Sequence, residues 1–296
     1  MLDRGQHLDW FTSPEIWVEL GLCLAAAWIF VTHTLTAREP LFERGMFADR
    51  NFALGMFFMV VTGVLLLAGL ALLPPLLQRL YGHSVFQSGL LTMPRGIGTL
   101  ITMVLAGRLI GRVDLRILVA SGMGLMAWSL HIMAGFSIEM GSGPIIVSGV
   151  IQGLGLGLMF VTIQSLAFAT LVPRLRTHAA SLLNLSRNIG GSIGISVVAA
   201  LLARNVQVAH ADMAANISDQ VLPSMSGTVV SQLGLPAEAA IALADAEINR
   251  QAAFIAYIDD FYLMMWVTLA SIPLVLLLRP AKKQQPGEMH DTLVID

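Results

Sequence analysis

Seven long apolar segments constrain this chain most, because each is long enough to cross a lipid bilayer as a helix. Hydrophobic residues make up 56% of the 296 residues and charged residues only 12%, whereas soluble domains contain about 25% charged residues. The segments show no strand-like alternation, and helices satisfy their own backbone hydrogen bonds in hydrocarbon. The sequence therefore predicts an all-α integral membrane bundle. The segments are 16–35, 52–77, 88–110, 115–138, 144–172, 179–203 and 261–278.

The distribution of lysine and arginine predicts the orientation of these segments. Basic residues gather in every second connection, and the connections between contain few of them. Short connections rich in lysine and arginine face the cytoplasm. We therefore expect a multi-pass protein of the inner (cytoplasmic) membrane with a cytoplasmic C-terminus and an outside N-terminus. The basic residues concerned are Arg38, Arg44, Arg50, Arg108, Arg112, Arg116, Arg174, Arg176, Arg279, Lys282 and Lys283.

The connection at 204–260 is longer and more polar than the others. We expect an exterior loop with one short amphipathic helix after Pro236. Its composition is compatible with a solvated cap and also with a gating lid or a partner surface. An outside N-terminus without a signal peptide further indicates that upstream helices are missing or supplied elsewhere.

A turn rich in glycine and arginine joins the segments 88–110 and 115–138. Its glycines allow two helices to approach closely, and its arginines favour the cytoplasmic side. Asp114 is placed to cap the next helix and to pair with an arginine. The turn is either an ordinary basic loop or a latch that breaks and re-forms as the bundle rocks. Its residues are Gly107, Arg108, Gly111, Arg112, Asp114 and Arg116.

Polar side chains within the apolar segments give the sharpest clue to function, because lipid does not tolerate them. Arg187 shares one helical face with two asparagines, and Arg95 follows Pro94. Hydrogen bonds between helices would explain each of them singly. Together they predict a polar path for amphipathic substrates with adaptable walls of methionine and phenylalanine. The predicted path consists of Gln152, Met159, Phe160, Gln164, Asn184, Arg187 and Asn188.

Prolines and glycines mark positions where helices should bend or approach closely. Pro74, Pro75 and Pro94 remove helical hydrogen bonds and should kink their helices, either passively or as hinges of an exterior gate. Gly153 and Gly157 lie one helical turn apart and predict a close crossing with a neighbouring helix.

Several classes of function are disfavoured. A net charge of −2 gives no basic signature for nucleic acid. The histidines lack metal-ligand spacing, and catalytic signatures are absent, which disfavours a membrane enzyme. We expect no aspartate or glutamate deep in the membrane, where proton-coupled transporters usually have one. The coupling machinery is therefore expected outside this chain.

Four motifs resemble the EmrB/QacA drug:proton antiporters, the branch of the major facilitator superfamily with roughly fourteen helices. They are LDRGQHLDWF (2–11), EPLFERGMFADRNF (39–52), LLPPLLQRLYGHSVFQSGLLTMPRGIG (72–98) and SLLNLSRNIGGSIG (181–194). The basic turn also resembles the family's loop motif between the second and third helices of each half.

This resemblance implies a major-facilitator-type bundle, made of a C-terminal six-helix domain and one linker transmembrane helix. The implied divisions are an exterior segment (1–15), the linker helix and a cytoplasmic loop (16–50), the six-helix domain (51–280) and a cytoplasmic tail (281–296).

The function that the resemblance implies is efflux of lipophilic drugs or toxic compounds by proton antiport. The proton gradient would be the energy source, and no cofactor or metal is expected. The implied partners are the lipid bilayer, lipophilic substrates, an N-terminal transporter half, a periplasmic adaptor and an outer-membrane channel. A truncated or split-gene fragment with a structural or regulatory role is the alternative.

Overall fold

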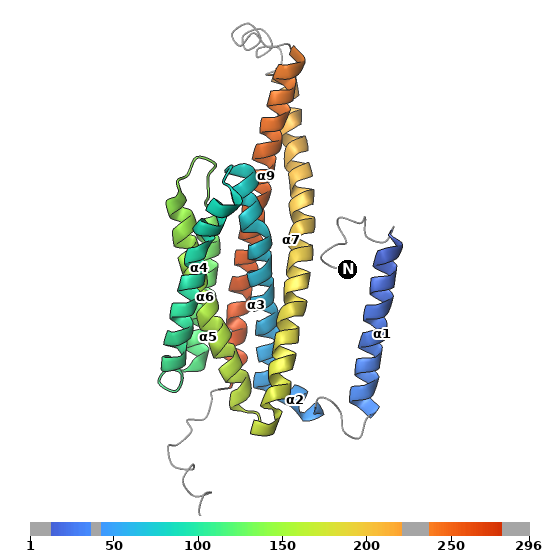
Figure 1. Ribbon diagram of the computed structural model, residues 1–296, viewed down its shortest axis with the longest axis vertical. Helices are drawn as coiled ribbons and strands as arrows, with labels where there is room; N and C mark the ends of the chain where they lie inside the picture. Colours follow the sequence, from blue (N-terminus) through green and yellow to red (C-terminus); the bar gives the residue numbers. More distant parts are fainter. Residues whose placement is uncertain (1–12, 37–42, 221–236, 280–296) are drawn as a thin grey trace, which may run out of the picture.

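The computed structural model describes residues 13–36, 43–220 and 237–279, which are helical apart from their turns (Figure 1). Within these residues, seven helical spans are long and apolar enough to cross a membrane, which confirms the predicted all-α membrane bundle. The helices that contain these spans are α1 (Pro14–Thr36), α3 (Arg50–Pro75) with the π-helical turn η2 (Leu76–Leu80), α4 (Val85–Leu109), α5 (Leu115–Ala134), α6 (Ser142–Ala169), α7 (Arg176–Gln220), and α9 (Ala237–Ser271) with the 3-10 turn η4 (Ile272–Leu277).

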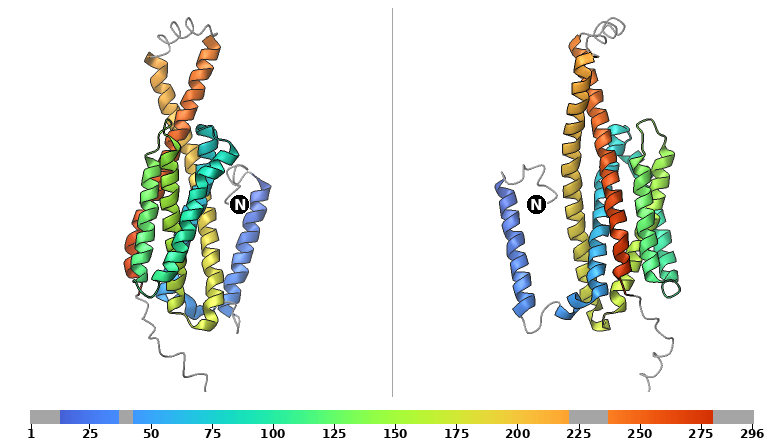
Figure 2. Two further views of the ribbon diagram at one scale, coloured as in Figure 1. Left: turned by 60° about the vertical axis from the view of Figure 1, so that its left-hand side comes forward. Right: turned by 180° about the vertical axis from the view of Figure 1, so that it is seen from behind.

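The six spans after α1 form one bundle. Helix α6 packs against α4, α5 and α3, while α7 packs against α3 and α9, and α9 also contacts α5. Helix α1 stands apart from this bundle in Figure 1 and in the view from behind in Figure 2. Most of its large side chains are exposed, with Trp28 at 71% and Leu22 at 67%, so lipid or another membrane segment must cover them.

Glycines set the closest helix crossings, as predicted for Gly153 and Gly157. A Cβ atom at Gly153 would collide with the carbonyl oxygen of Arg95 on α4, and one at Gly157 with the hydroxyl of Thr102. In lipid, helices associate through such close packing rather than through a hydrophobic driving force between them. The α4–α6 crossing therefore depends on the absence of these side chains.

One end of the bundle carries the short helix α2 (Arg44–Ala48), the α4–α5 turn and the 3-10 turn η3 (Pro173–Leu175), and is called the basic end here. The Asp49 carboxylate caps α3 by accepting from the Phe52 backbone N–H at 2.8 Å, and it also accepts from the Thr170 hydroxyl at 2.8 Å. The buried Asn51 side chain exchanges two hydrogen bonds with the backbone of Arg279. These bonds join the start of α3 to the ends of α6 and of the last span.

At the opposite, projecting end, α7 and α9 extend well beyond the other helices (Figures 1 and 2). The sequence predicted a loop over 204–260 with one short helix. Instead, α7 continues to Gln220, and α9 begins at Ala237 and runs unbroken into the last span. These stretches are rich in alanine, the strongest helix former, and a contact of 3.0 Å between His210 and Asp245 joins the two arms.

The prolines have different local effects. Helix α3 includes Pro74 and Pro75 and passes directly into the π-helical turn η2, as expected where helical hydrogen bonds are lost. Helix α4 continues unbroken through Pro94. A role of these prolines in a gate stays a prediction.

Several sequence predictions lie outside the described residues. They concern most of the exterior segment at 1–15 with its motif at 2–11, the basic residue Arg38, the helix start at Pro236, and the cytoplasmic tail at 281–296.

Candidate functional site

A cavity of about 580 Å³ lies between α3, α4, α6 and α7. Most of its wall is apolar, with a few polar groups, a combination typical of small-molecule sites. The described side chains that line it come from all four helices. They are Thr62, Leu66, Gly69, Leu70, Leu73, Pro74, Thr92, Arg95, Gly96, Thr99, Leu100, Met103, Leu156, Phe160 and Arg187.

Arg95 is the main polar group of this wall. Helix α4 begins with a capping box between Ser84 and Gln87, and Arg95 lies ten residues after Val85, about 15 Å along the helix. Its side chain is buried, with 8% exposed. The only hydrogen bond seen for its guanidinium in the described part of the chain is a long one, from Nη2 to the Leu66 carbonyl oxygen at 3.4 Å. Because a guanidinium has five N–H donors, most of its capacity is unused.

Gln152 on α6 lies beside this guanidinium. It is 1% exposed, and neither its amide nitrogen nor its amide oxygen has a hydrogen-bond partner in the structure. A Cβ atom at Gly69 would lie 3.5 Å from Nη1 of Arg95 and 3.6 Å from Nε2 of Gln152, so both side chains meet over this glycine. Buried polar atoms without partners are rare in proteins and call for a functional explanation.

Arg187 on α7 supplies a second positive charge. Its guanidinium carbon lies 5.5 Å from the ring centroid of Phe160, within the range of a cation–π interaction. Arg187 is half-buried, whereas Arg95 is almost completely buried. The lining therefore has two guanidinium groups and, among its described residues, no carboxylate.

The predicted path residues do not all come together. Phe160 and Arg187 line the cavity and Gln152 adjoins it, but Gln164, Asn184 and Asn188 are absent from the described lining. Asn184 and Asn188 are exposed.

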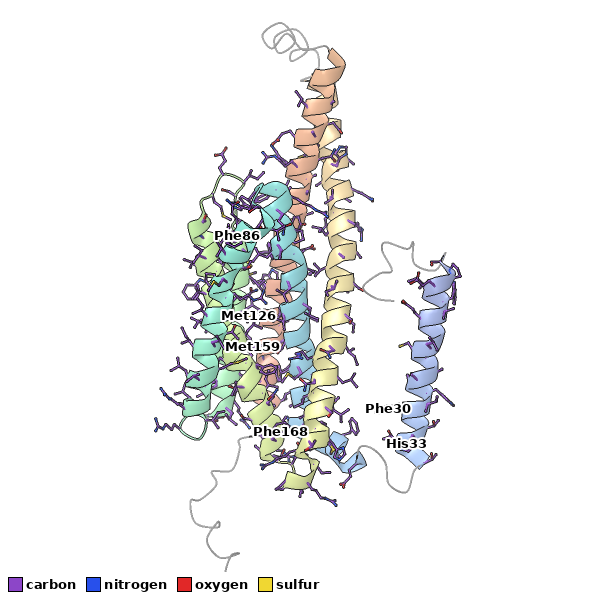
Figure 3. All side chains as sticks on the ribbon, in the orientation of Figure 1. Phe30, His33, Phe86, Met126, Met159 and Phe168 are labelled. Carbon is purple, nitrogen blue, oxygen red and sulfur yellow. The ribbon has the colours of Figure 1, made fainter. Side chains whose placement is uncertain are left out.

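Met159 faces away from the cavity. It packs over Gly122 of α5, and Met126 of α5 packs over Gly155 of α6 in return. Figure 3 shows both methionines close together inside the bundle. Met159 and Phe160 are neighbours in sequence but point about 100° apart around the helix.

One acidic residue lies in a different environment from the one that the sequence predicted. No deeply buried carboxylate was expected, and Asp260 was assigned to the exterior loop. The structure buries Asp260 completely on α9, and neither of its carboxylate oxygens has a hydrogen-bond partner. A helical pattern could have revealed it, because Ala256, Tyr257 and Met264 lie on the same helix face and are buried too.

The basic turn has the geometry expected of a tight helix connection. Gly111 has a φ of +86°, which L side chains rarely adopt. The Asp114 carboxylate caps α5 by accepting from the Arg116 backbone N–H at 3.0 Å. Arg108 and Arg112 are exposed. The predicted ion pair of Asp114 with an arginine is not seen within the described residues, so the latch stays a prediction.

The family model of the Major Facilitator Superfamily matches residues 10–195. The multidrug export protein EmrB of Escherichia coli K12 is 28% identical over 284 residues, covering 95% of this chain and 55% of that protein. The fatty acid resistance protein FarB of Neisseria gonorrhoeae is 28% identical over 282 residues, with the same coverage of 95% and 55%.

A multidrug resistance protein B homolog of Mycobacterium tuberculosis H37Rv is 31% identical over 210 residues, covering 70% of this chain and 38% of that protein. The chain thus spans about half the length of the curated relatives it matches. The match of the family model covers more than half of this chain, and the EmrB-type relatives agree with the resemblance seen in the motifs. This multi-pass membrane protein therefore belongs to the major facilitator superfamily.

Proposed function

We propose that this chain forms the C-terminal part of a transporter that exports lipophilic compounds by proton antiport. The observation that carries the proposal is the apolar cavity between α3, α4, α6 and α7, with the guanidinium of Arg95 on its wall and the amide of Gln152, which has no hydrogen-bond partner, beside it. A purely structural fragment would have no need for buried donors without partners. The relatives named for multidrug export support efflux as the activity, and the relative named for fatty acid resistance supports lipophilic substrates.

Asp260 supports proton coupling within this proposal. An ionised carboxylate without partners is unfavourable inside a membrane bundle, so an ionisable group kept there is a candidate for proton binding. The sequence led us to expect the coupling machinery outside this chain. The burial of Asp260 changes that expectation. In the proposal, α9 contributes a proton-binding group and the cavity contributes the substrate site.

The proposed orientation places the basic end in the cytoplasm. Arg108, Arg112 and Arg174 lie at this end, as the positive-inside rule requires of cytoplasmic loops. The last described residue, Arg279, lies there as well, which supports a cytoplasmic C-terminus in the inner membrane.

An N-terminal transporter half is the proposed partner. Helices α4 and α7, which border the cavity, expose large apolar side chains, including Leu100 at 67% and Ile189 at 48%. A second half would cover them and close the cavity from its open side. A periplasmic adaptor and an outer-membrane channel complete the proposed export route.

The test is efflux of a lipophilic fluorescent dye from cells that lack other exporters. The chain is expressed with a cognate N-terminal half, as wild type, as Gly69→Leu and as Gly124→Leu. A leucine at Gly69 would fill the cavity, whereas Gly124 on α5 has open space around it. We expect efflux by the wild type and Gly124→Leu and a loss of at least about tenfold in Gly69→Leu, in line with a blocked binding site. Equal efflux by both variants, or none by the wild-type pair, would contradict the proposal.

A further inference from the structure

We infer that the cavity selects lipophilic anions, and that Arg95 binds their anionic group. This inference rests on the proposed function, since it names the substrate class of the same cavity. Three observations carry it: the balance of charge around the cavity, the unused donors on its wall, and the apolar surface beside them.

The charge around the cavity is entirely positive. Arg95 and Arg187 line it, and α3, α4 and α6 contain no aspartate or glutamate at all. The first acidic residue of α7 is Asp212, twenty-five positions beyond Arg187, or about 37 Å along the helix. No carboxylate of the lining helices can therefore neutralise Arg95, and a bound anion would supply the missing charge.

The donors on the wall suit an anion. Arginine stays protonated in proteins and presents a planar fork that matches the two oxygens of a carboxylate or sulfonate. The Arg95 fork makes one long bond to the Leu66 carbonyl oxygen, and the amide nitrogen of Gln152 beside it has no partner. Both groups meet over Gly69, which itself lines the cavity.

The rest of the wall suits an apolar body. Leu66, Leu70, Leu100, Met103 and Phe160 surround the polar pair. A ligand with one anionic group on a hydrophobic body satisfies both parts of the cavity. A lipophilic cation would meet two positive charges with no counter-charge, and such like-charge contacts exclude wrong partners.

The test measures binding of three probes with the same ring system but different charge. They are 2-naphthoate, which is ionised near pH 7, its neutral analogue 2-naphthamide, and (2-naphthylmethyl)trimethylammonium. The full chain is reconstituted together with a cognate N-terminal half in nanodiscs of zwitterionic phosphatidylcholine, and binding to protein-free nanodiscs is subtracted. We expect 2-naphthoate to bind at least about tenfold more tightly than the amide, the usual gain from a hydrogen bond to a charged group. The ammonium compound should bind weakest.

Three variants locate the selectivity. Arg95→Gln should reduce the preference for 2-naphthoate over the amide about tenfold, while Arg95→Lys should retain part of it because it keeps the charge but not the fork. Arg204→Gln is the matched control, because Arg204 is an exposed arginine of α7, outside both the cavity lining and the basic turn. It should bind all three probes as the wild type does.

The binding results distinguish a failure of this inference from a failure of the proposed function on which it rests. If the wild type binds the amide or the ammonium compound as tightly as 2-naphthoate, the inference is overturned but the cavity remains a substrate site. If no probe binds, the proposed substrate site fails as well. If Arg95→Gln and Arg95→Lys both retain the full preference, Arg95 is not the anion-binding residue.

A lipid headgroup could offer the same anionic chemistry as a substrate. The measurement is therefore repeated in nanodiscs containing phosphatidylglycerol at about one third of the lipid. Unchanged binding of 2-naphthoate supports a site for soluble amphiphiles. Loss of binding would show a site occupied by anionic lipid and would overturn the inference.

Discussion

Arg95 and Asp260 are the buried charged side chains in the described part of the bundle, and their surroundings differ. Arg95 lies on the wall of a cavity, next to space that a ligand could fill. Asp260 lies on a face of α9 where Ala256, Tyr257 and Met264 are also buried, and α9 packs against α5 and α7. Burial alone therefore does not assign a role. A charge beside open space can bind a molecule, whereas an enclosed carboxylate can exchange only something as small as a proton.

The largest expected difference is between the packed interior of the bundle and the cavity wall, in their tolerance of lost side-chain volume. Met126→Ala removes a fully buried side chain that packs over Gly155, whereas Leu100→Ala shortens an exposed side chain of the cavity wall. We expect Met126→Ala to lower the free energy of unfolding by about 2 kcal/mol or more, and Leu100→Ala by less than about 0.5 kcal/mol. Unfolding in detergent mixtures with increasing dodecyl sulfate measures both values. Equal losses would show that the cavity region is packed as tightly as the α5–α6 contact.

The second prediction concerns transport by Asp260→Asn. The amide keeps the shape of the side chain but cannot take up and release a proton. With a cognate N-terminal half in proteoliposomes, export driven by a pH gradient should fall at least about tenfold, within the usual contribution of a proton-transferring group. Movement of substrate down its own gradient should be unaffected.

Asp259→Asn is the matched control for this prediction. Asp259 is the neighbouring carboxylate and is exposed, so its variant should transport as the wild type does. Wild-type coupling in Asp260→Asn would remove the proposed role of Asp260, as would an equal loss in both variants.

The smallest expected effect lies at the projecting end of the bundle. The Tyr81 hydroxyl donates to the Ser137 carbonyl oxygen at 2.6 Å, and its ring packs edge-on against Phe254 of α9. Tyr81→Phe should lower the free energy of unfolding by about 1 kcal/mol, the usual contribution of one hydrogen bond.

The effect of Tyr81→Phe should depend on pH. Burial raises the pKa of the Tyr81 hydroxyl to about 12, so the folded state holds this proton more strongly than the unfolded state, whose pKa is about 10. The stability from this group is present below about pH 10 and is lost as pH rises towards about 12. The stability difference between wild type and Tyr81→Phe should shrink over that range, and a constant difference would contradict the assignment.

The number and type of the spans could be predicted from the sequence because they depend on length and hydropathy. The α4–α6 crossing was also predictable, since Gly153 and Gly157 leave a small-residue stripe that any partner helix can use. The extension of α7 and α9 was missed because hydropathy windows stop at polar residues, although alanine-rich polar stretches continue a helix in water.

The site could be predicted only in part, because a single sequence does not show which helix covers which face. Phe160 and Met159 were both predicted to line a substrate path; Phe160 lines the cavity, but its neighbour Met159 packs against α5. Met159 can pack there because Gly122, on α5, has no side chain in the way. The sequence of α6 alone cannot show this. Asp260 was missed for a related reason: the pair Asp259–Asp260 looks like a loop until one sees that only the second residue lies on the buried face.

Thiol labelling tests most directly whether the cavity, and not the α9 core, is the ligand site. Cys23 is the single cysteine and is exposed, so Cys23→Ser gives a cysteine-free background. Thr99→Cys then places a thiol on the cavity wall, and Thr268→Cys places one on the buried face of α9 that includes Asp260. We predict that N-ethylmaleimide labels position 99 at least about tenfold faster than position 268, because an opening of the core is needed at the latter. A lipophilic ligand should slow labelling at position 99 only, whereas equal labelling at both positions, or no protection at position 99, would contradict the account.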